Sequence, residues 1–166
     1  MNHRKIGLGI AAAAIAGVTA LSAQAENIRV AFIDPLSGVF AAVGISGLKQ
    51  YEFVADQINK EGGVMGKNIE VVGYDNKISP KESLIQLKRV IAGGIQYVFQ
   101  GNSSGVANAL TDAIKKHNKR NPDKRVLFLN YSAVDPKLTN EKCNFWHFRF
   151  DANADMKMNA LTDVIA

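Results

Sequence analysis

The residues best suited to bind a ligand form one short segment. Residues 99–107 read FQGNSSGVA and lead from an apolar stretch into a helical pattern. The first backbone N–H groups of a helix lack acceptors within the helix, and the helix dipole places partial positive charge there. Asn102, Ser103 and Ser104 add amide and hydroxyl donors, and Gly105 lets a ligand approach closely. The segment predicts a carboxylate site, with ordinary N-capping by Ser103 or Ser104 as the alternative.

Other reactive side chains do not form a catalytic or metal-binding pattern. The three histidines lack the spacing of metal ligands. The sequence contains no Walker phosphate loop, no G-x-G-x-x-G and no G-x-S-x-G. Asp34, Asp75 and Asp135 follow expected strands, where a catalytic acid could act, but we interpret them as loop and capping residues. We therefore expect no enzyme activity, no metal and no cofactor.

Cys143 is the only cysteine, so an intramolecular disulfide is impossible. His147 lies four residues later in an alternating stretch, which predicts that both side chains share one face of a strand. Such a pair could form a nucleophile and its base. We interpret Cys143 instead as a buried structural thiol.

The N-terminus has the three parts of a secretory signal peptide. Arg4 and Lys5 are followed by an uncharged apolar run over residues 6–21 and by a small-x-small site that ends at Ala25. The apolar run is shorter than the roughly 20 residues of a membrane span. A lipoprotein anchor would require a cysteine at the cleavage site, and none is present. We expect cleavage after Ala25, export to a bacterial periplasm and no membrane span in the mature chain.

The formal net charge is +5, with 20 basic and 15 acidic side chains. Basic residues cluster in KKHNKR (residues 115–120) and PDKR (residues 122–125). A nucleic-acid site favours aromatic side chains among such charges, and this cluster contains none. We interpret it as a solvated helix end, where the dipole favours cations, and expect no nucleic-acid partner.

Apolar runs that alternate with helical patterns define the expected fold. Strands are predicted at residues 28–33, 68–74, 95–100, 125–130 and 145–150. Helices are predicted around residues 48–58, from Pro80, over residues 106–117 and from about Ala152. Nearly continuous apolar strands separated by helices predict an α/β fold, a doubly wound parallel sheet with helices on both faces.

Two of these helices carry further detail. Ser79, Pro80 and Glu82 match an N-cap, a first helical position and a capping box. The apolar face of the first helix is assigned to five residues: Leu48, Tyr51, Phe53, Val54 and Ile58.

Three loops follow the expected strands at the edge where open α/β sheets bind ligands. Their sequences are DPLSGVFAAVG (residues 34–44), GNSSGVA (residues 101–107) and YSAVDPKLT (residues 131–139). All three contain Ser, Gly or Ala, which leaves backbone groups accessible. The sequence therefore predicts one shared site at this edge.

The sequence resembles a known family, the periplasmic leucine/isoleucine/valine-binding proteins of branched-chain amino acid ABC transporters. The resemblance runs from about Ile28 to Phe150. Its most specific parts are PLSG (residues 35–38), NKEGGVMG (residues 59–66) and YDNKISP (residues 74–80). VDPKLT before FWHFRF also resembles the family's turn before an arginine-bearing strand.

The resemblance implies a type I periplasmic binding protein fold, with two lobes that close on a small ligand. Residues 1–25 would be the signal peptide, residues 26–150 the N-terminal lobe, and residues 151–166 the start of the crossover, with the second lobe largely missing. The implied function is capture of a small carboxylate in the periplasm and its delivery to an ABC transporter permease. A ligand-sensing receptor module of the same fold is the alternative.

The resemblance also implies roles for individual residues. Ser103 and Ser104, next to Asn102, would hold the ligand carboxylate. The loop after the fourth strand would contribute Ser132, Ala133 and Val134. Phe40 would form a wall of the side-chain pocket.

Two departures from the family pattern affect the expected ligand. Val134 stands where amino-acid binders often have Thr, and Tyr131 stands where Pro is common. Tyr131 and Phe40 could stack on a planar ring. The expected ligands are therefore a branched-chain or aromatic amino acid, or an aromatic acid. Ile78 and Ser103 occupy the positions of the family's small disulfide, so that bridge is absent.

Overall fold

The computed structural model describes residues 26–165. The predicted signal peptide, with its cleavage after Ala25, lies outside the described residues. Five strands, four helices and one 3₁₀ turn follow in chain order: β1 (Ile28–Asp34), α1 (Ala41–Lys60), β2 (Ile69–Asp75), α2 (Pro80–Ala92), β3 (Tyr97–Gln100), α3 (Ser104–Arg120), β4 (Leu127–Asn130), η1 (Pro136–Leu138), β5 (His147–Arg149) and α4 (Ala154–Ile165).

The strands form one parallel sheet in the order β2-β1-β3-β4-β5. Phe32 of β1 pairs with Gly73 of β2 on one side and with Phe99 of β3 on the other. The predicted α/β class and parallel sheet are confirmed. Because all strands run the same way, the loops after β1, β3 and β4 meet at one edge of the sheet.

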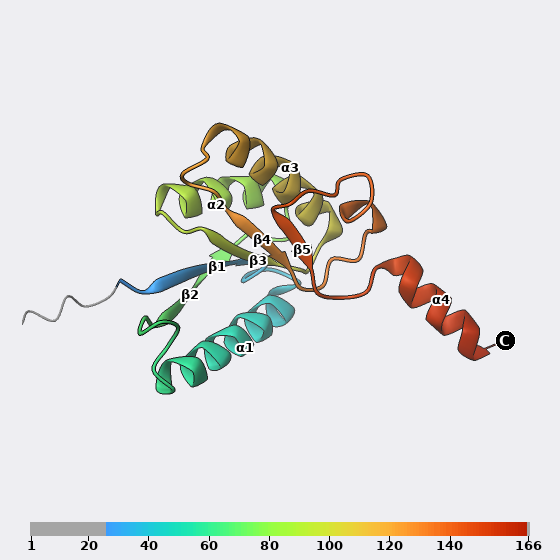
Figure 1. Cartoon of the computed structure of the whole chain (residues 1–166). Helices are drawn as coiled ribbons and strands as arrows, with labels where there is room; N and C mark the ends of the chain where they lie inside the picture. The colour runs from blue at the N-terminus through green and yellow to red at the C-terminus, as the bar shows by residue number, and fades with distance from the viewer. Residues whose placement is uncertain (1–25, 166) are drawn as a thin grey trace, which may run out of the picture.

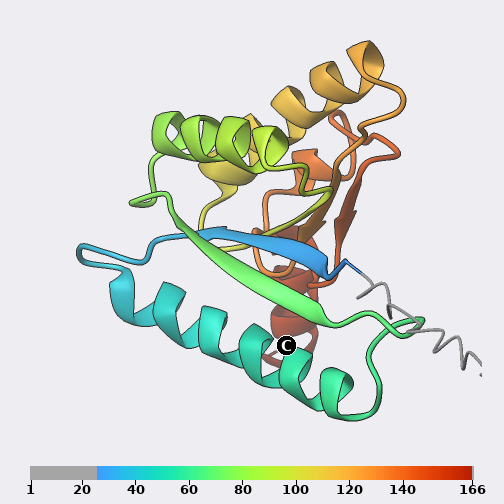
Figure 2. The same cartoon turned by 90° about the vertical axis from the view of Figure 1, so that its left-hand side faces the viewer.

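Helices cover both faces of the sheet. Helix α1 lies on one face and α2 and α3 lie on the other (Figures 1 and 2). The main core lies between the sheet and the α2–α3 layer, where Val98 and Phe128 of the strands pack with Leu110 of α3, all fully buried. Burial of this kind supplies most of the stabilising free energy of such a domain.

The starts of α2 and α3 follow local sequence. Ser79 is the N-cap of α2 and its hydroxyl accepts a hydrogen bond from the N–H of Glu82 at 3.3 Å, with Pro80 as the first helical residue. Ser103 caps α3 in the same way, and its hydroxyl accepts from the N–H of Val106 at 3.3 Å. Each hydroxyl satisfies one N–H that has no acceptor within its helix.

Helix α1 lies close to the loop after β1 because Gly44 has no side chain. A Cβ at Gly44 would lie 1.8 Å from the carbonyl oxygen of Pro35. The predicted buried face of α1 is partly wrong, because Phe53 is 64% exposed and Val54 53% exposed. Tyr51, in contrast, packs against Phe32, with 5.3 Å between the ring centroids.

The C-terminal segment differs from the prediction at Cys143. Cys143 is exposed and lies in the turn before β5, where its N–H donates to the carbonyl of Asn140 at 3.0 Å. The expected buried thiol and the shared strand face with His147 are therefore wrong, because β5 begins only at His147. Helix α4 projects from the body (Figure 1) and has no buried residue. None of the helices within residues 26–165 has the length and apolarity needed to cross a membrane.

Candidate functional site

The loops after β1, β3 and β4 lie side by side because these three strands are neighbours in the sheet. Each strand contributes a buried polar residue at its end: Asp34 of β1, Gln100 of β3 and Asn130 of β4. Buried polar groups cost free energy unless they find hydrogen-bond partners. In this protein those partners are the loops themselves, so the three side chains position the candidate site.

Asp34 connects the three loops. Its carboxylate accepts hydrogen bonds from the backbone N–H groups of Gly101 and Asn102, each at 3.2 Å, and from the hydroxyl of Tyr131 at 2.5 Å. The side-chain amide of Asn102 donates in turn to the Tyr131 oxygen at 2.9 Å. Two backbone N–H groups of the segment 99–107 are therefore bonded to the protein's own carboxylate.

The ring of Tyr131 packs against Gly101 in the loop after β3 and against Phe32 of β1. It stacks on Phe32, with 5.8 Å between the centroids and an interplanar angle of 14°. A Cβ at Gly101 would lie 2.6 Å from this ring, so only glycine fits there. Gly101 is therefore required for contact between the loops after β3 and β4.

Burial sets the pKa values in this cluster. Desolvation raises the pKa of Asp34 above its ordinary value, and the hydrogen bonds from Tyr131, Asn102 and Gly101 oppose that rise. Burial, with the nearby Asp34 charge, raises the pKa of Tyr51 to about 12. The same two causes raise the pKa of Tyr131 further above its ordinary value. Both phenols therefore stay protonated at neutral pH.

The start of α3 retains free donors. The hydroxyl of Ser103 is occupied in capping, as the N-capping alternative predicted. The hydroxyl of Ser104 accepts from the N–H of Asp135 at 3.2 Å, which leaves its own proton available to donate. Among residues 26–165, no group accepts a hydrogen bond from the backbone N–H of Ser104 or Gly105. These two N–H groups, at the positive end of the helix dipole, are the candidate anion site.

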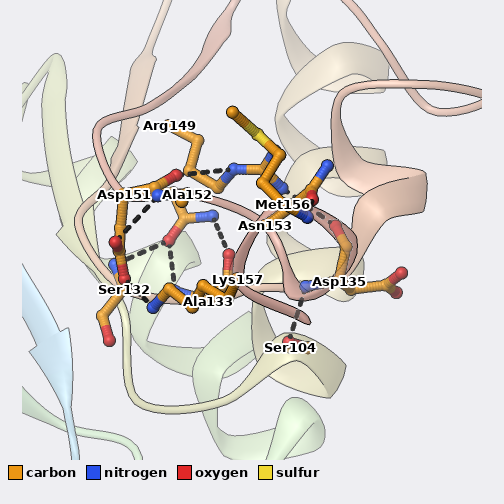
Figure 3. A network of polar contacts seen from close by, with 11 residues as sticks. Ser104, Ser132, Ala133, Asp135, Arg149, Asp151, Ala152, Asn153, Met156 and Lys157 are labelled. Carbon is orange, nitrogen blue, oxygen red and sulfur yellow. Dashed lines mark hydrogen bonds and ion pairs between the residues drawn. The ribbon is translucent and has the colours of Figure 1, made fainter. Parts of the chain in front are cut away.

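Asn130 shapes the loop after β4. The side-chain oxygen of Asn130 accepts from the N–H groups of Ser132 at 3.1 Å and Ala133 at 2.7 Å. Figure 3 shows Ser132 and Ala133 beside residues of the segment after β5, and the Ser104 hydroxyl in contact with Asp135.

The guanidinium group of Arg149 joins the loop after β4 to the segment that leads into α4. It donates to the carbonyl of Asp135 at 3.0 Å, the hydroxyl of Thr139 at 2.8 Å and the carbonyl of Asp151 at 3.1 Å. The carbonyl of Val134 accepts from the N–H of Ala154 at 2.9 Å. Val134 therefore contributes a backbone oxygen to the start of α4.

Two depressions lie at this edge. The larger, about 520 Å³, lies between α1 and the loops after β3 and β4, with Asn102, Tyr131 and Ser132 in its wall. The smaller, about 250 Å³, lies between the loops after β1 and β2 and contains Phe40. Phe40 and Tyr131 thus border different depressions, although both belong to the same edge.

The predicted site residues lie on the three converging loops, except Ser104, which begins α3. Of the buried residues that hold these loops, Gln100 and Asn130 were missed, and Asp34 was given only a loop or capping role. Asp75 and Asp135 have the loop and capping roles expected of them, for example in accepting from the N–H of Lys77 and Lys137, each at 3.0 Å. Asp34 does more, because it connects three loops. The sequence did contain a signal for these residues, because each of the three strands ends in a polar side chain: Asp34, Gln100 and Asn130.

Comparisons with known proteins agree with this geometry. The family model described as "Periplasmic binding protein" matches residues 27–166. The chain belongs to this family. A Leu/Ile/Val-binding protein homolog 4 of Brucella abortus (strain 2308) is 37% identical over 153 residues, which are 92% of this chain and 37% of that protein.

Solved structures of the family extend the likeness to the fold. The closed form of a leucine-, isoleucine-, valine-, threonine- and alanine-binding protein from Brucella ovis has a TM-score of 0.76 at 35% identity, over 84% of this chain and 37% of that one. A branched-chain amino acid transporter substrate-binding protein from Streptococcus pneumoniae, in complex with isoleucine, has a TM-score of 0.65 at 27% identity, over 76% and 34%. This periplasmic binding protein chain thus spans little more than a third of the length of these relatives.

Proposed function

We propose that this protein is the periplasmic solute-binding component of an ABC importer and performs no chemistry on its ligand. It would bind a small carboxylate at the edge formed by the loops after β1, β3 and β4, and deliver it to a membrane permease. Closure of this lobe against a second lobe would retain the ligand, since contacts to both lobes favour the closed state. Membership of the family and the relatives' names support this role.

One observation carries the proposal: the unpaired N–H groups of Ser104 and Gly105 at the start of α3. A carboxylate placed there gains charge-assisted hydrogen bonds of about 1.5–3 kcal/mol each. The Ser104 hydroxyl can donate a further bond. The proposed ligands remain a branched-chain or aromatic amino acid, or an aromatic acid.

The first prediction tests the N–H of Ser104 with a matched pair of variants. Ser104→Pro removes this N–H at the first helical position, where proline is well tolerated after the extended Ser103 (φ −162°, ψ 123°). Ser104→Ala removes the hydroxyl and keeps the N–H. By isothermal titration of the full-length protein, we expect Ser104→Pro to bind about 10- to 150-fold more weakly than Ser104→Ala. Equal affinities of the two variants would place the carboxylate elsewhere.

The ligand class is decided by titrating the wild-type protein with L-isoleucine, L-leucine, L-phenylalanine and 4-hydroxybenzoate. Binding of leucine or isoleucine without any signal from the hydroxybenzoate would reject the aromatic acid. The opposite result would reject the aliphatic amino acids. If the wild-type protein binds none of these carboxylates, the proposed binding of a small carboxylate is contradicted.

A further inference from the structure

Asp34 is a buried carboxylate without a buried counter-ion. Its side chain is fully buried at the end of β1, and none of the ion pairs found among residues 26–165 includes it. A buried charge is costly unless hydrogen bonds compensate it. The compensating donors are neutral and come from two other loops, as Gly101, Asn102 and Tyr131. This is the arrangement of an anion-binding site in which the anion belongs to the protein.

Tyr131 completes the arrangement. Its oxygen receives a hydrogen bond from the Asn102 side chain, so its single proton is directed to Asp34. Its ring is fixed by the stack on Phe32 and by the absence of a side chain at Gly101. The hydroxyl therefore has one partner as donor and one as acceptor, and neither place is left for a ligand.

We propose that Asp34 and Tyr131 are positioning residues that hold the loop after β3 in its ligand-binding conformation before any ligand is present. The side chain of Asp34 takes two loop N–H groups and thereby leaves those of Ser104 and Gly105 as the donors that face a ligand. The link to binding rests on the proposed function. The conformational role of the pair does not, and it can be measured separately.

The conformational role is tested by hydrogen exchange of the Gly101 and Asn102 amides, followed by NMR in the full-length protein. Asp34→Asn keeps the shape but presents an NH₂ group to at least one of the three donors, and Tyr131→Phe removes only the hydroxyl. We expect each variant to speed exchange at these amides at least tenfold. The double variant should exceed the larger single effect by less than twofold, since both residues act through one network.

Asn118→Ala is the matched control. Asn118 is buried near the C-terminal end of α3, far along the helix from the candidate site. Its side chain donates to the carbonyl of Val126, just before β4, and accepts from the N–H of Val126, both at 2.8 Å. Its loss should destabilise the lobe as a whole. The exchange rates of the Gly101 and Asn102 amides, relative to those of the other amides of the lobe, should stay unchanged. Equal loop exchange in Asp34→Asn, Tyr131→Phe and Asn118→Ala would overturn the positioning role.

The effect on binding is measured with whichever of L-isoleucine, L-phenylalanine or 4-hydroxybenzoate the wild-type protein binds. We expect Tyr131→Phe to weaken binding at least fivefold and Asn118→Ala to change it less than twofold. An unchanged affinity in Tyr131→Phe with faster loop exchange would overturn the link between the pair and the site. If the wild type binds none of these probes, the proposed ligand class fails, while the exchange rates still decide the positioning role.

Discussion

At the scale of single residues, the candidate site depends on a few buried polar side chains more than on the exposed ones. Asp34 and Asn130 are fully buried and hold the loops that carry the predicted ligand contacts. Ser103, in contrast, uses its hydroxyl for its own helix. Replacement of Asp34 would therefore alter the candidate site by releasing the backbone of the loop after β3.

The second prediction concerns alkaline pH. Burial raises the pKa of Tyr51 to about 12 and raises that of Tyr131 above its ordinary value of 10.0. The folded state thus holds both phenol protons more tightly than the unfolded state. Their contribution to stability is complete below pH 10 and is lost as pH rises through the folded pKa values.

This loss is measured as the free energy of urea unfolding at pH 8 and pH 11. We expect the wild type to lose stability over this interval, and Tyr51→Phe and Tyr131→Phe to lose less, because phenylalanine has no proton to release. Parallel pH profiles of the wild type and both variants would contradict the assignment. Removal of the hydroxyl in Tyr131→Phe also lowers the free energy of unfolding at pH 8. The comparison therefore uses the change in this free energy between pH 8 and pH 11, not its absolute value.

At the scale of elements, α2 and α3 begin where the local sequence provides a side-chain cap. Helix α2 has the full set of signals, with Ser79, Pro80 and Glu82 in the expected positions. Helix α3 begins at Ser104 because Ser103 provides the cap. The start of α3 is at the same time the candidate binding site, so a change at Ser103 affects stability and binding together.

The third prediction separates these two effects. Ser79→Ala removes the cap of α2, which contributes no donor to the candidate site, and Ser103→Ala removes the cap of α3 within the site. We expect each variant to lower the free energy of unfolding by about 1 kcal/mol. Only Ser103→Ala should also weaken binding of the ligand that titration identifies. A similar fall in affinity in Ser79→Ala would show that general destabilisation explains the effect.

At the scale of the whole molecule, the two faces of the sheet differ. The α2–α3 face has a continuous buried core. On the other face, α1 packs mainly through Leu48, Tyr51 and Ala55, with Leu48 against Gly73, while Phe53 points to solvent. Stability should therefore respond far more to changes on the α2–α3 side.

The fourth prediction uses Leu110 and Phe53 as a pair. Leu110 is fully buried and Phe53 is 64% exposed. We expect Leu110→Ala to lower the free energy of unfolding by about 2–5 kcal/mol, because it leaves a cavity. Phe53→Ala should change it by about 0.5 kcal/mol or less, as is usual for exposed positions. Chemical denaturation measures both, and equal effects would contradict the asymmetry of the two faces.

Much of the fold follows from the sequence because its signals are local. Five apolar runs predicted the five strands, and Ser79-Pro80 predicted the start of α2 to the residue. The sequence also indicated which loops meet, since parallel strands place their carboxyl ends at one edge. Phe53 and Cys143 were assigned wrongly because periodicity alone does not show how far a helix face is covered or where a short strand begins.

Composition and spacing by themselves determined the α/β class, the parallel sheet and the edge that carries the candidate site. Only the tertiary structure decided which donors in that edge are free. Asp34 and Gly101 are 67 residues apart, and Asp34 and Tyr131 are 97 apart, so no local pattern indicates their contact. The physical reason is that a buried carboxylate takes its partners from whichever loops the sheet order places beside it.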